Sequence, residues 1–190
     1  ITNAKLASDL ISGETDIGAN ISDADLFLLD DGAGGTLRKS AASRLKTYVG
    51  GGITVADQWR LTANFTGDAD PIASNLEQVD QTAEGTIGSA MTQSSGIFTF
   101  PSTGIYLVGF QVLFYLGNDE SRYNVAKIQA TTNNSSYAVI AYGSAFNISV
   151  ASTNSYNNVY VNSLVDVTDT ANVKVKFTID VENSSAAPQG

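Results

Sequence analysis

The sequence predicts an all-β protein built from antiparallel strands, and three observations lead to this fold class. Charged residues make up only 15% of the chain, while Asn, Ser, Thr, Gly and Ala are abundant, a composition typical of β proteins with polar faces. From residue 53 onward, apolar runs of strand length alternate with turn residues at regular intervals. The third observation is the run GIFTFPSTGIYLVGFQVLFYL over residues 96–116, whose nearly uninterrupted apolar half indicates a strand buried on both faces.

Residues 1–52 differ in composition from the rest and are predicted to form an N-terminal segment with one helix. Ser40 is a suitable N-cap for residues 41–49, whose apolar side chains recur at helical spacing, and Gly50 supplies the stop. A helix of about nine residues is marginal alone in water, so we expect it to dock on a neighbouring subunit or partner. The glycines at 50–52 indicate a hinge before the main domain.

The main domain, residues 53–190, has the strand and turn pattern of a β-sandwich or jelly roll. Its last predicted strand alternates most regularly, because apolar residues from Val173 to Val181 are separated by Lys, Thr and Asp. An antiparallel strand in a chain of this size buries one face in its own core, so an identical neighbour is the obvious cover for the second face of residues 104–116. The predicted strands cover residues 58–65, 86–91, 96–100, 104–116, 123–131, 136–145, 157–167 and 172–181.

Composition excludes several classes of function. The net charge is −9 and no basic run is longer than Arg38-Lys39, which disfavours binding to nucleic acid or to an anionic membrane. The chain has no His and no Cys, so zinc and copper sites, disulfides and the usual Ser-His nucleophile are excluded, and we expect no enzymatic activity. No apolar run reaches the roughly 20 residues of a membrane span, so no membrane insertion is expected.

The segment from Gln58 to Val112 resembles the globular-head family of complement component 1q and tumour necrosis factor. The resemblance lies in an aromatic-led first strand and in TIGSAMTQSSGIFTFPSTGIYLVGFQV, and it extends to a polar turn at 164–170. It implies a ten-stranded jelly roll that assembles as a homotrimer and binds partners through loops and trimer grooves. The side chains then expected in the trimer interface or the core are Phe98, Tyr106, Phe110, Phe114 and Phe177.

The end of the chain departs from that family, whose members usually close with an aromatic, apolar strand. Here the last residues read ENSSAAPQG. We expect either that a closing strand is missing or that a neighbouring segment replaces it.

Residues 17–50 resemble a segment that recurs in virion proteins of tailed phages, particularly marine ones, where it precedes fibre, spike or appendage domains. The matching strings are ISDAD at 21–25, LLD at 28–30, the glycine-rich turn at 32–35, Arg38-Lys39 and the helix ending YVG at 48–50. The resemblance implies localisation in a virion, on tail or capsid, with residues 1–52 joining other virion proteins.

Acidic residues are the remaining candidates for metal binding, because Ca²⁺ prefers carboxylate oxygens. The spacing of the densest group fits no EF-hand loop, and the other pairs lie in predicted loops, so solvated carboxylates are the favoured interpretation and calcium the alternative. No other cofactor is expected. The candidates are Asp23, Asp25, Asp30 and Asp31, together with the pairs Asp68/Asp70 and Asp119/Glu120.

Tyrosines beside Asn-rich loops are the candidates for contact with a receptor. Aromatic faces next to amide groups suit sugars or partner proteins, since they combine flat apolar area with hydrogen bonding. Tyrosines at sheet edges with hydroxyls in water are the alternative interpretation. The residues predicted to face a receptor are Tyr123, Asn133, Asn134, Tyr137, Tyr156 and Asn157.

Together these observations predict a homotrimeric structural protein of a phage particle, a fibre or spike knob that binds a host-surface glycan or protein. Two alternatives remain open at this point. One is a capsid decoration or joining protein with no receptor, and the other is a secreted complement-like lectin.

Overall fold

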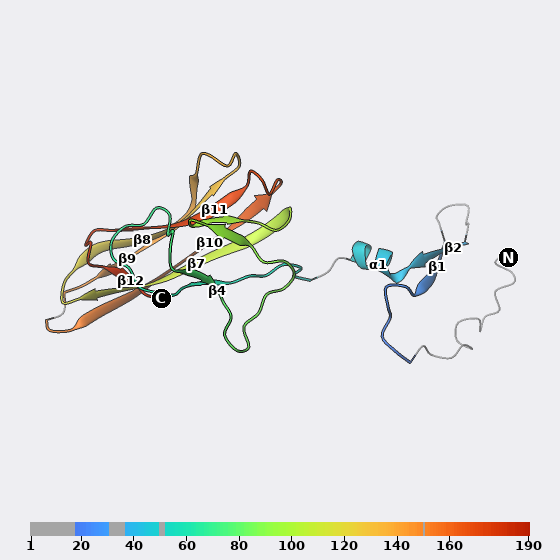
Figure 1. The fold of residues 1–190 in the computed structure, drawn as a ribbon, viewed down its shortest axis with the longest axis horizontal. Coiled ribbons are helices and arrows are strands. Elements are labelled where there is room, and N and C mark those ends of the chain that lie inside the picture. The colour runs from blue at the N-terminus through green and yellow to red at the C-terminus, as the bar shows by residue number, and fades with distance from the viewer. Residues whose placement is uncertain (1–17, 31–36, 50–51, 150) are drawn as a thin grey trace. The chain divides into compact units, whose positions relative to one another are not determined.

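The computed structural model of the protein describes residues 18–30, 37–49, 52–149 and 151–190. Within these ranges the chain is mostly β-strand with one short helix and all strand pairs are antiparallel, so the predicted all-β class is confirmed. The chain divides into two compact units, Ile1–Gly52 and Ile53–Gly190 (Figure 1).

The N-terminal unit contains a two-stranded hairpin followed by a helix. Strand β1 spans Leu26–Asp30, β2 spans Leu37–Ala41, and helix α1 spans Ala42–Val49. The predicted helix is confirmed, but Ser40 is not its N-cap, because Ser40 belongs to β2 and pairs with Phe27. At the helix start the N–H of Ala42 instead donates to the carbonyl oxygen of Asp25 at 2.8 Å.

The second unit carries the remaining strands. They are β3 (Trp59–Leu61), β4 (Leu76–Gln78), β5 (Thr92–Ser94), β6 (Ile97–Thr99), β7 (Gly104–Gly117), β8 (Ser121–Thr131), β9 (Ala138–Asn147), β10 (Asn154–Val167), β11 (Lys174–Val181) and β12 (Ala187–Pro188).

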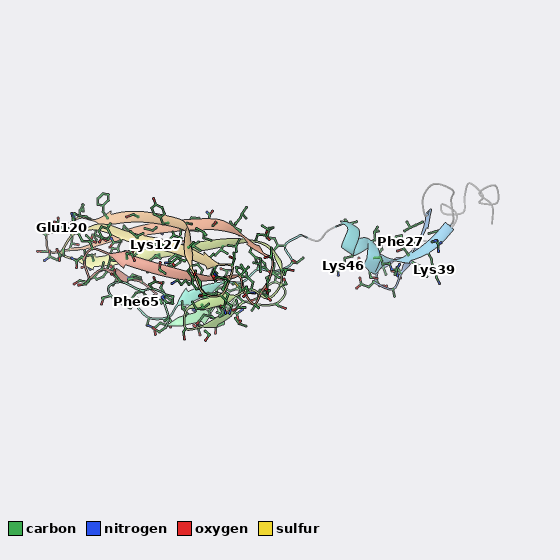
Figure 2. All side chains as sticks on the ribbon, turned by 90° about the horizontal axis from the view of Figure 1, so that it is seen from above. Phe27, Lys39, Lys46, Phe65, Glu120 and Lys127 are labelled. Carbon is green, nitrogen blue, oxygen red and sulfur yellow. The ribbon has the colours of Figure 1, made fainter. Side chains whose placement is uncertain are left out.

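These strands form a five-stranded sheet, a three-stranded sheet and a small hairpin. The five-stranded sheet has the order β5-β6-β11-β8-β9, the three-stranded sheet the order β10-β7-β12, and β3 pairs with β4. Buried side chains from the two larger sheets belong to one hydrophobic core. The two larger sheets therefore pack face to face as a sandwich (Figure 1; Figure 2 shows the side chains).

Strand β7 is the centre of the three-stranded sheet and pairs along its whole length with β10, from Gly104↔Val167 to Gly117↔Asn154. Its even-numbered side chains from Val108 to Leu116 point into the core, and the odd-numbered ones point outward. Phe114 is fully buried, with 0% of its surface exposed.

The turn between β5 and β6 shows why the chain has glycine at position 96. Ser95 has a φ of 50° and Gly96 a φ of 81°, so both residues of this two-residue loop are left-handed, as in a type I′ hairpin. A Cβ on Gly96 would lie 2.3 Å from the carbonyl oxygen of Ile72. Any other residue at this position would therefore displace the loop that passes beside the hairpin.

The core is built mainly from β-branched residues and phenylalanine. A chain of ring contacts crosses it: Trp59 lies 5.3 Å from Phe98, Phe98 lies 5.2 Å from Phe177, and Phe177 lies 4.9 Å from Phe110. Edge-on and tilted contacts of this kind add stability beyond burial alone.

The long strands were predicted well and the short ones poorly. The predictions for 104–116, 123–131, 136–145, 157–167 and 172–181 match β7 to β11 to within three residues at each end. The prediction of a strand at 86–91 is wrong, since Ile87 makes only an isolated bridge with Ala56. Of the predicted 58–65 only Trp59–Leu61 is strand, of 96–100 only Ile97–Thr99, and β1, β2, β4 and β5 were missed.

The segment ENSSAAPQG itself supplies a closing strand, so the expectation of a missing or replaced strand is wrong. Ala187 pairs with Tyr115 and Pro188 with Phe114, and the N–H of Gln189 donates to the carbonyl oxygen of Leu113 at 2.9 Å. Small side chains fit here because Ala186 and Ala187 are buried against the core.

Phe114→Ala should destabilise the protein strongly, whereas the chemically identical change Phe146→Ala should not. Phe114 is fully buried and Phe146 is 64% exposed, so only the first change leaves a cavity. We expect Phe114→Ala to lower the free energy of unfolding by about 3–5 kcal/mol and Phe146→Ala by less than about 1 kcal/mol. Urea denaturation followed by fluorescence at one protein concentration measures both. Equal losses would contradict the assignment of the core face.

Candidate functional site: an outward apolar sheet face

The outward side of β7 carries large apolar side chains that the described residues leave uncovered. Ile105 is 66% exposed and Leu107 68% exposed, and Leu113 further along the strand is also exposed. A strand that was predicted to be buried on both faces is thus buried on only one face within a single chain. A second cover for this face, and an identical neighbour as that cover, remain predictions.

Strand β10 extends this surface because its outward side chains pair with those of β7. Leu164 lies directly opposite Leu107, and Tyr156 lies opposite Tyr115. Leu164 is 69% exposed, and the two β10 tyrosines are exposed to a similar degree. We call this surface the apolar sheet face; it consists of Ile105, Leu107, Leu113, Tyr156, Tyr160 and Leu164.

The apolar sheet face carries almost no charge. Among the outward-facing residues of β7 and β10, Asp166 is the one charged side chain, and it sits at the margin opposite Ile105. Depletion of charge and enrichment in tyrosine distinguish the centres of protein interfaces from ordinary surface. Exposed apolar side chains that gather on one sheet face often mark an interaction site. Here Gln111, Asn158 and Asn162 also point outward between the apolar side chains.

Glycine at position 109 keeps the middle of the face flat. A Cβ on Gly109 would lie 3.1 Å from the Tyr160 hydroxyl oxygen and 3.4 Å from a carbon of the same ring. The tyrosine ring therefore lies across the glycine backbone, and the sheet presents a smooth surface at this point.

Two long strand edges lie beside the face. Strand β10 ends the three-stranded sheet, β9 ends the five-stranded sheet, and the two strands contact each other on the same side of the sandwich. Neither edge pairs with a further strand among the described residues. Long unpaired edges are usually protected in soluble proteins. The exposed apolar side chains on or next to β9 are Val139, Ile140, Tyr142, Phe146 and Ile148.

The aromatic residues predicted for the core or trimer interface all lie on the core side. Phe98 and Phe114 are buried, and Tyr106, Phe110 and Phe177 pack against the core as partly buried side chains. None of them belongs to the apolar sheet face. The strand was identified correctly, but the exposed face carries its odd-numbered residues, which the alternation starting from Val108 could have indicated.

The residues predicted to face a receptor lie at two opposite ends of the sandwich. Asn133, Asn134 and Tyr137 belong to the β8–β9 connection. Tyr137 is half-buried under Lys176, whose Nζ lies 4.8 Å from the ring centre, and burial raises the pKa of its hydroxyl.

The other predicted receptor residues lie near the opposite ends of β8 and β10. Tyr123 and Tyr156 are exposed there. Asn157 instead points inward and donates from Nδ2 to Asn147 Oδ1 at 2.7 Å.

Four of the candidate calcium ligands, Asp25, Asp68, Asp70 and Asp119, use their side chains in protein hydrogen bonds or ion pairs. Asp68 accepts from the N–H of Val181 at 2.7 Å, and Asp70 pairs with Lys176 at 2.5 Å. In the described residues no group of three acidic side chains is arranged to hold a metal ion. Asp31 lies outside the described residues.

Comparison with known proteins adds no assignment. The chain matches no protein-family model, and no curated protein matches it. In the part of the chain that the structure describes, no helix is both long and apolar enough to cross a membrane. The apolar sheet face and its neighbouring edges are therefore the main geometric evidence for function.

If the chain self-associates through the apolar sheet face, Leu107→Asp should abolish that association, because it places a charge opposite Leu164 and next to Ile105 without touching the core. The matched control is Thr132→Asp, which adds the same charge on the exposed β8–β9 connection. We expect light scattering to give the mass of one chain for Leu107→Asp and an unchanged larger mass for the control. Circular dichroism should show that both variants keep the β-sandwich. A Leu107→Asp variant that associates as the unmodified chain does would rule out this face as the contact.

Proposed function

We propose that the chain is a non-enzymatic structural protein of a tailed-phage virion. In this proposal residues 53–190 form a jelly-roll knob of the complement 1q and tumour necrosis factor type that assembles as a homotrimer. Residues 1–52 join the knob to other virion proteins, and the knob binds a glycan or protein on the host surface.

The connections between strands support the jelly-roll assignment. β6 and β7 lie in different sheets, and the same is true of β7 and β8, of β9 and β10, and of β10 and β11. A chain that passes back and forth between two packed antiparallel sheets is characteristic of Greek-key sandwiches and jelly rolls.

The single observation that carries self-assembly is the apolar sheet face lying beside two strand edges that are unpaired among the described residues; the number of copies, three, comes from the resemblance. If the β9–β10 edge of one copy packs on the apolar sheet face of the next, the contact is heterologous, because it uses two different surfaces. Such a contact forms a closed ring when its rotation closes. One ring then covers the leucines and the backbone edges of β9 and β10 in every copy, which a twofold contact through the face alone would not do. Tyr142 and Phe146 stay outside this contact, because they point to the outer face of the five-stranded sheet: a Cβ on Gly143 between them would lie 2.9 Å from Val161 in the core.

The N-terminal unit supports a joining role through its exposed leucines. Leu26, Leu28 and Leu29 on β1 are all exposed, and α1 is only 8 residues long. A two-stranded hairpin and a short helix are marginal on their own in water. The unit therefore gains stability by docking on another protein, and the resemblance of residues 17–50 to virion proteins indicates which kind.

The absence of His and Cys from the sequence is the reason for proposing a non-enzymatic role. Individually weak contacts suffice for a knob of this kind, since three copies multiply the strength of attachment.

Light scattering on the full chain and on a variant without residues 1–49 tests the assembly. We expect three times the mass of one chain in both cases, because the face and both edges belong to the second unit. A single-chain mass in both would remove the trimer from the proposal.

Binding to cells is tested separately with fluorescently labelled chain and a panel of bacterial strains. We expect adsorption to some strains and not to others. A trimer that adsorbs to none would favour the alternative of a capsid decoration protein without a receptor.

A further inference from the structure

The β7–β8, β9–β10 and β11–β12 connections meet at one end of the second unit. The N–H of Asn118 donates to the carbonyl oxygen of Thr153 at 3.1 Å, and Asn183 Nδ2 donates to Asp119 Oδ2 at 2.8 Å. We call this region the far end; Glu120 marks it in Figure 2.

The far end lies opposite to the end at which the chain enters this unit. Near the start of the unit, Asp57 accepts a hydrogen bond from the N–H of Met91 at 2.8 Å. Met91 precedes β5, and Thr92 at the start of β5 pairs with Thr99 in β6. Thr99 in turn pairs with Lys174, the first residue of β11, so the chain enters the unit at the end where β11 begins. The far end lies beyond the last residue of β11.

A β-bulge shapes the far end. Ser121 pairs with Asn147 and Asn124 with Ala145, so β8 has one more residue than β9 between these pairs. The extra residue allows both Arg122 and Tyr123 to point outward, where simple alternation would turn one of them into the core. Bulges that re-aim side chains in this way occur frequently beside functional sites.

On one side of Arg122 lies a polar depression of about 380 Å³, lined by Glu120, Arg122, Glu182, Asn183 and Ser184. Its polar groups are held in place. Glu182 accepts from the backbone N–H of Arg122 at 2.6 Å and also pairs with the Arg122 guanidinium. The Asn183 side-chain amide donates to Asp119 and to the carbonyl oxygen of Glu120.

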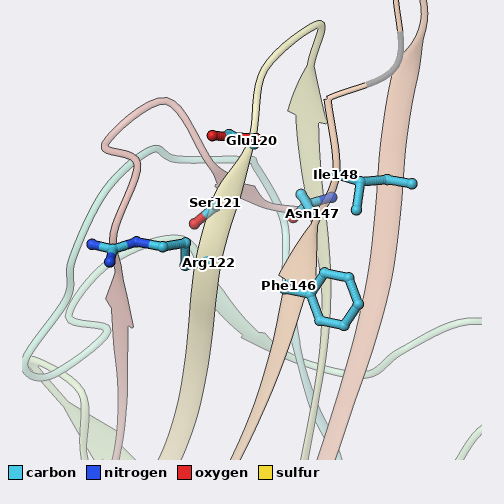
Figure 3. Close-up of a pocket in the computed structure, with 6 residues that line it drawn as sticks. All are labelled: Glu120, Ser121, Arg122, Phe146, Asn147 and Ile148. Carbon is cyan, nitrogen blue, oxygen red and sulfur yellow. The ribbon is translucent and has the colours of Figure 1, made fainter.

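On the other side lies a more apolar depression of about 330 Å³ (Figure 3). Phe146 near the end of β9 and Ile148 just after that strand supply its apolar surface, and Glu120 and Arg122 line it as well. Phe146 and Ile148 are both exposed. Ser121 and Asn147 also line this depression, and both are almost fully buried. Two depressions, one apolar and one polar, thus flank the same short stretch of β8.

We propose that the far end binds carbohydrate, which specifies the ligand class of the proposed host-binding function and rests on it. The Phe146 ring and Ile148 receive the apolar C–H face of one sugar. Arg122, Glu182 and Asn183 hydrogen-bond the hydroxyl groups of the next. Sugars combine an apolar face with a rim of hydroxyl groups, and a site for them needs apolar area with a few fixed polar groups beside it.

The charges at the far end select among carbohydrates. Asp119, Glu120 and Glu182 are the carboxylates of the far end, and Arg122, which pairs with Glu182, is the one basic residue that lines the two depressions, so the local charge is negative. The backbone hydrogen bond from Arg122 lowers the pKa of Glu182, and the backbone N–H of Glu120 lowers that of Asp119. Both carboxylates therefore stay ionised at neutral pH. The site favours neutral or amine-bearing sugars over uronates and sulfated sugars, which the carboxylates repel.

The test applies the full chain, in its assembled form, to an array of neutral, amine-bearing and acidic oligosaccharides. We expect binding to neutral or amine-bearing members. Phe146→Ala and Arg122→Ala should each weaken that binding about tenfold. The matched control is Tyr142→Ala, which removes another exposed aromatic ring from the same face of β9, about 14 Å along the strand. It should change the affinity less than about twofold.

Two results on the array would overturn the inference. One is an affinity for neutral or amine-bearing sugars that neither Phe146→Ala nor Arg122→Ala changes, and the other is a preference for acidic sugars. Adsorption to bacteria that survives periodate oxidation of their surface sugars, with no binding to the array, would identify a protein receptor. That outcome overturns the carbohydrate inference and leaves host binding standing. Absence of binding to both cells and array would remove host binding as well.

Discussion

The rest of the structure depends on one constraint at β7. This strand carries apolar side chains on both faces, but the hydrophobic core of the second unit covers only one of them. Its even-numbered side chains, Phe114 among them, pack between the two sheets, and its odd-numbered leucines point outward. Shifting the register by one residue would exchange the two sets and expose the phenylalanines, so the arrangement cannot relax by slipping. The leucines stay exposed within the described residues, so the proposed assembly would cover the outward side chains of the same strand that builds the core.

The strand edges lead to the same conclusion independently. Soluble proteins protect exposed edges with short strands, charged side chains or proline. Strand β12 uses two of these devices, since it is two residues long and contains Pro188, and β5 is only three residues long. Strands β9 and β10 are long, and β9 carries no charged residue. Edges built in this way are suited to burial against another copy, and they lie on the side of the sandwich next to the outward leucines.

The sequence predicted the strands that are long enough to show a period and missed those that are not. The alternation from Val173 to Val181 spans most of β11, whereas three-residue strands such as β4 contain no repeat to detect. The aromatic residues predicted for the trimer interface or the core lie in or against the core, Phe110 among them, whereas the outward Leu107 was not singled out. The bulge at Arg122 depends on pairing between β8 and β9, which a single sequence does not display. Tyr123 beside the bulge was predicted to face a receptor; it is exposed, and its role remains a prediction.

Hydrogen bonding replaces apolar packing at the far end. Asn124 donates to Asn147 Oδ1 at 2.8 Å, Asn157 donates to the same oxygen, and Ser121 donates to Asn124 Oδ1, so that β8, β9 and β10 are joined beneath the bulge. Buried amides are costly unless they are paired, and within this network Asn157 Oδ1 alone lacks a described donor. Directional bonds allow fewer alternative arrangements than packed methyl groups do. A network of this kind is therefore suited to hold Arg122 and Phe146 in fixed positions, and such preorganisation lowers the entropy lost on binding a ligand.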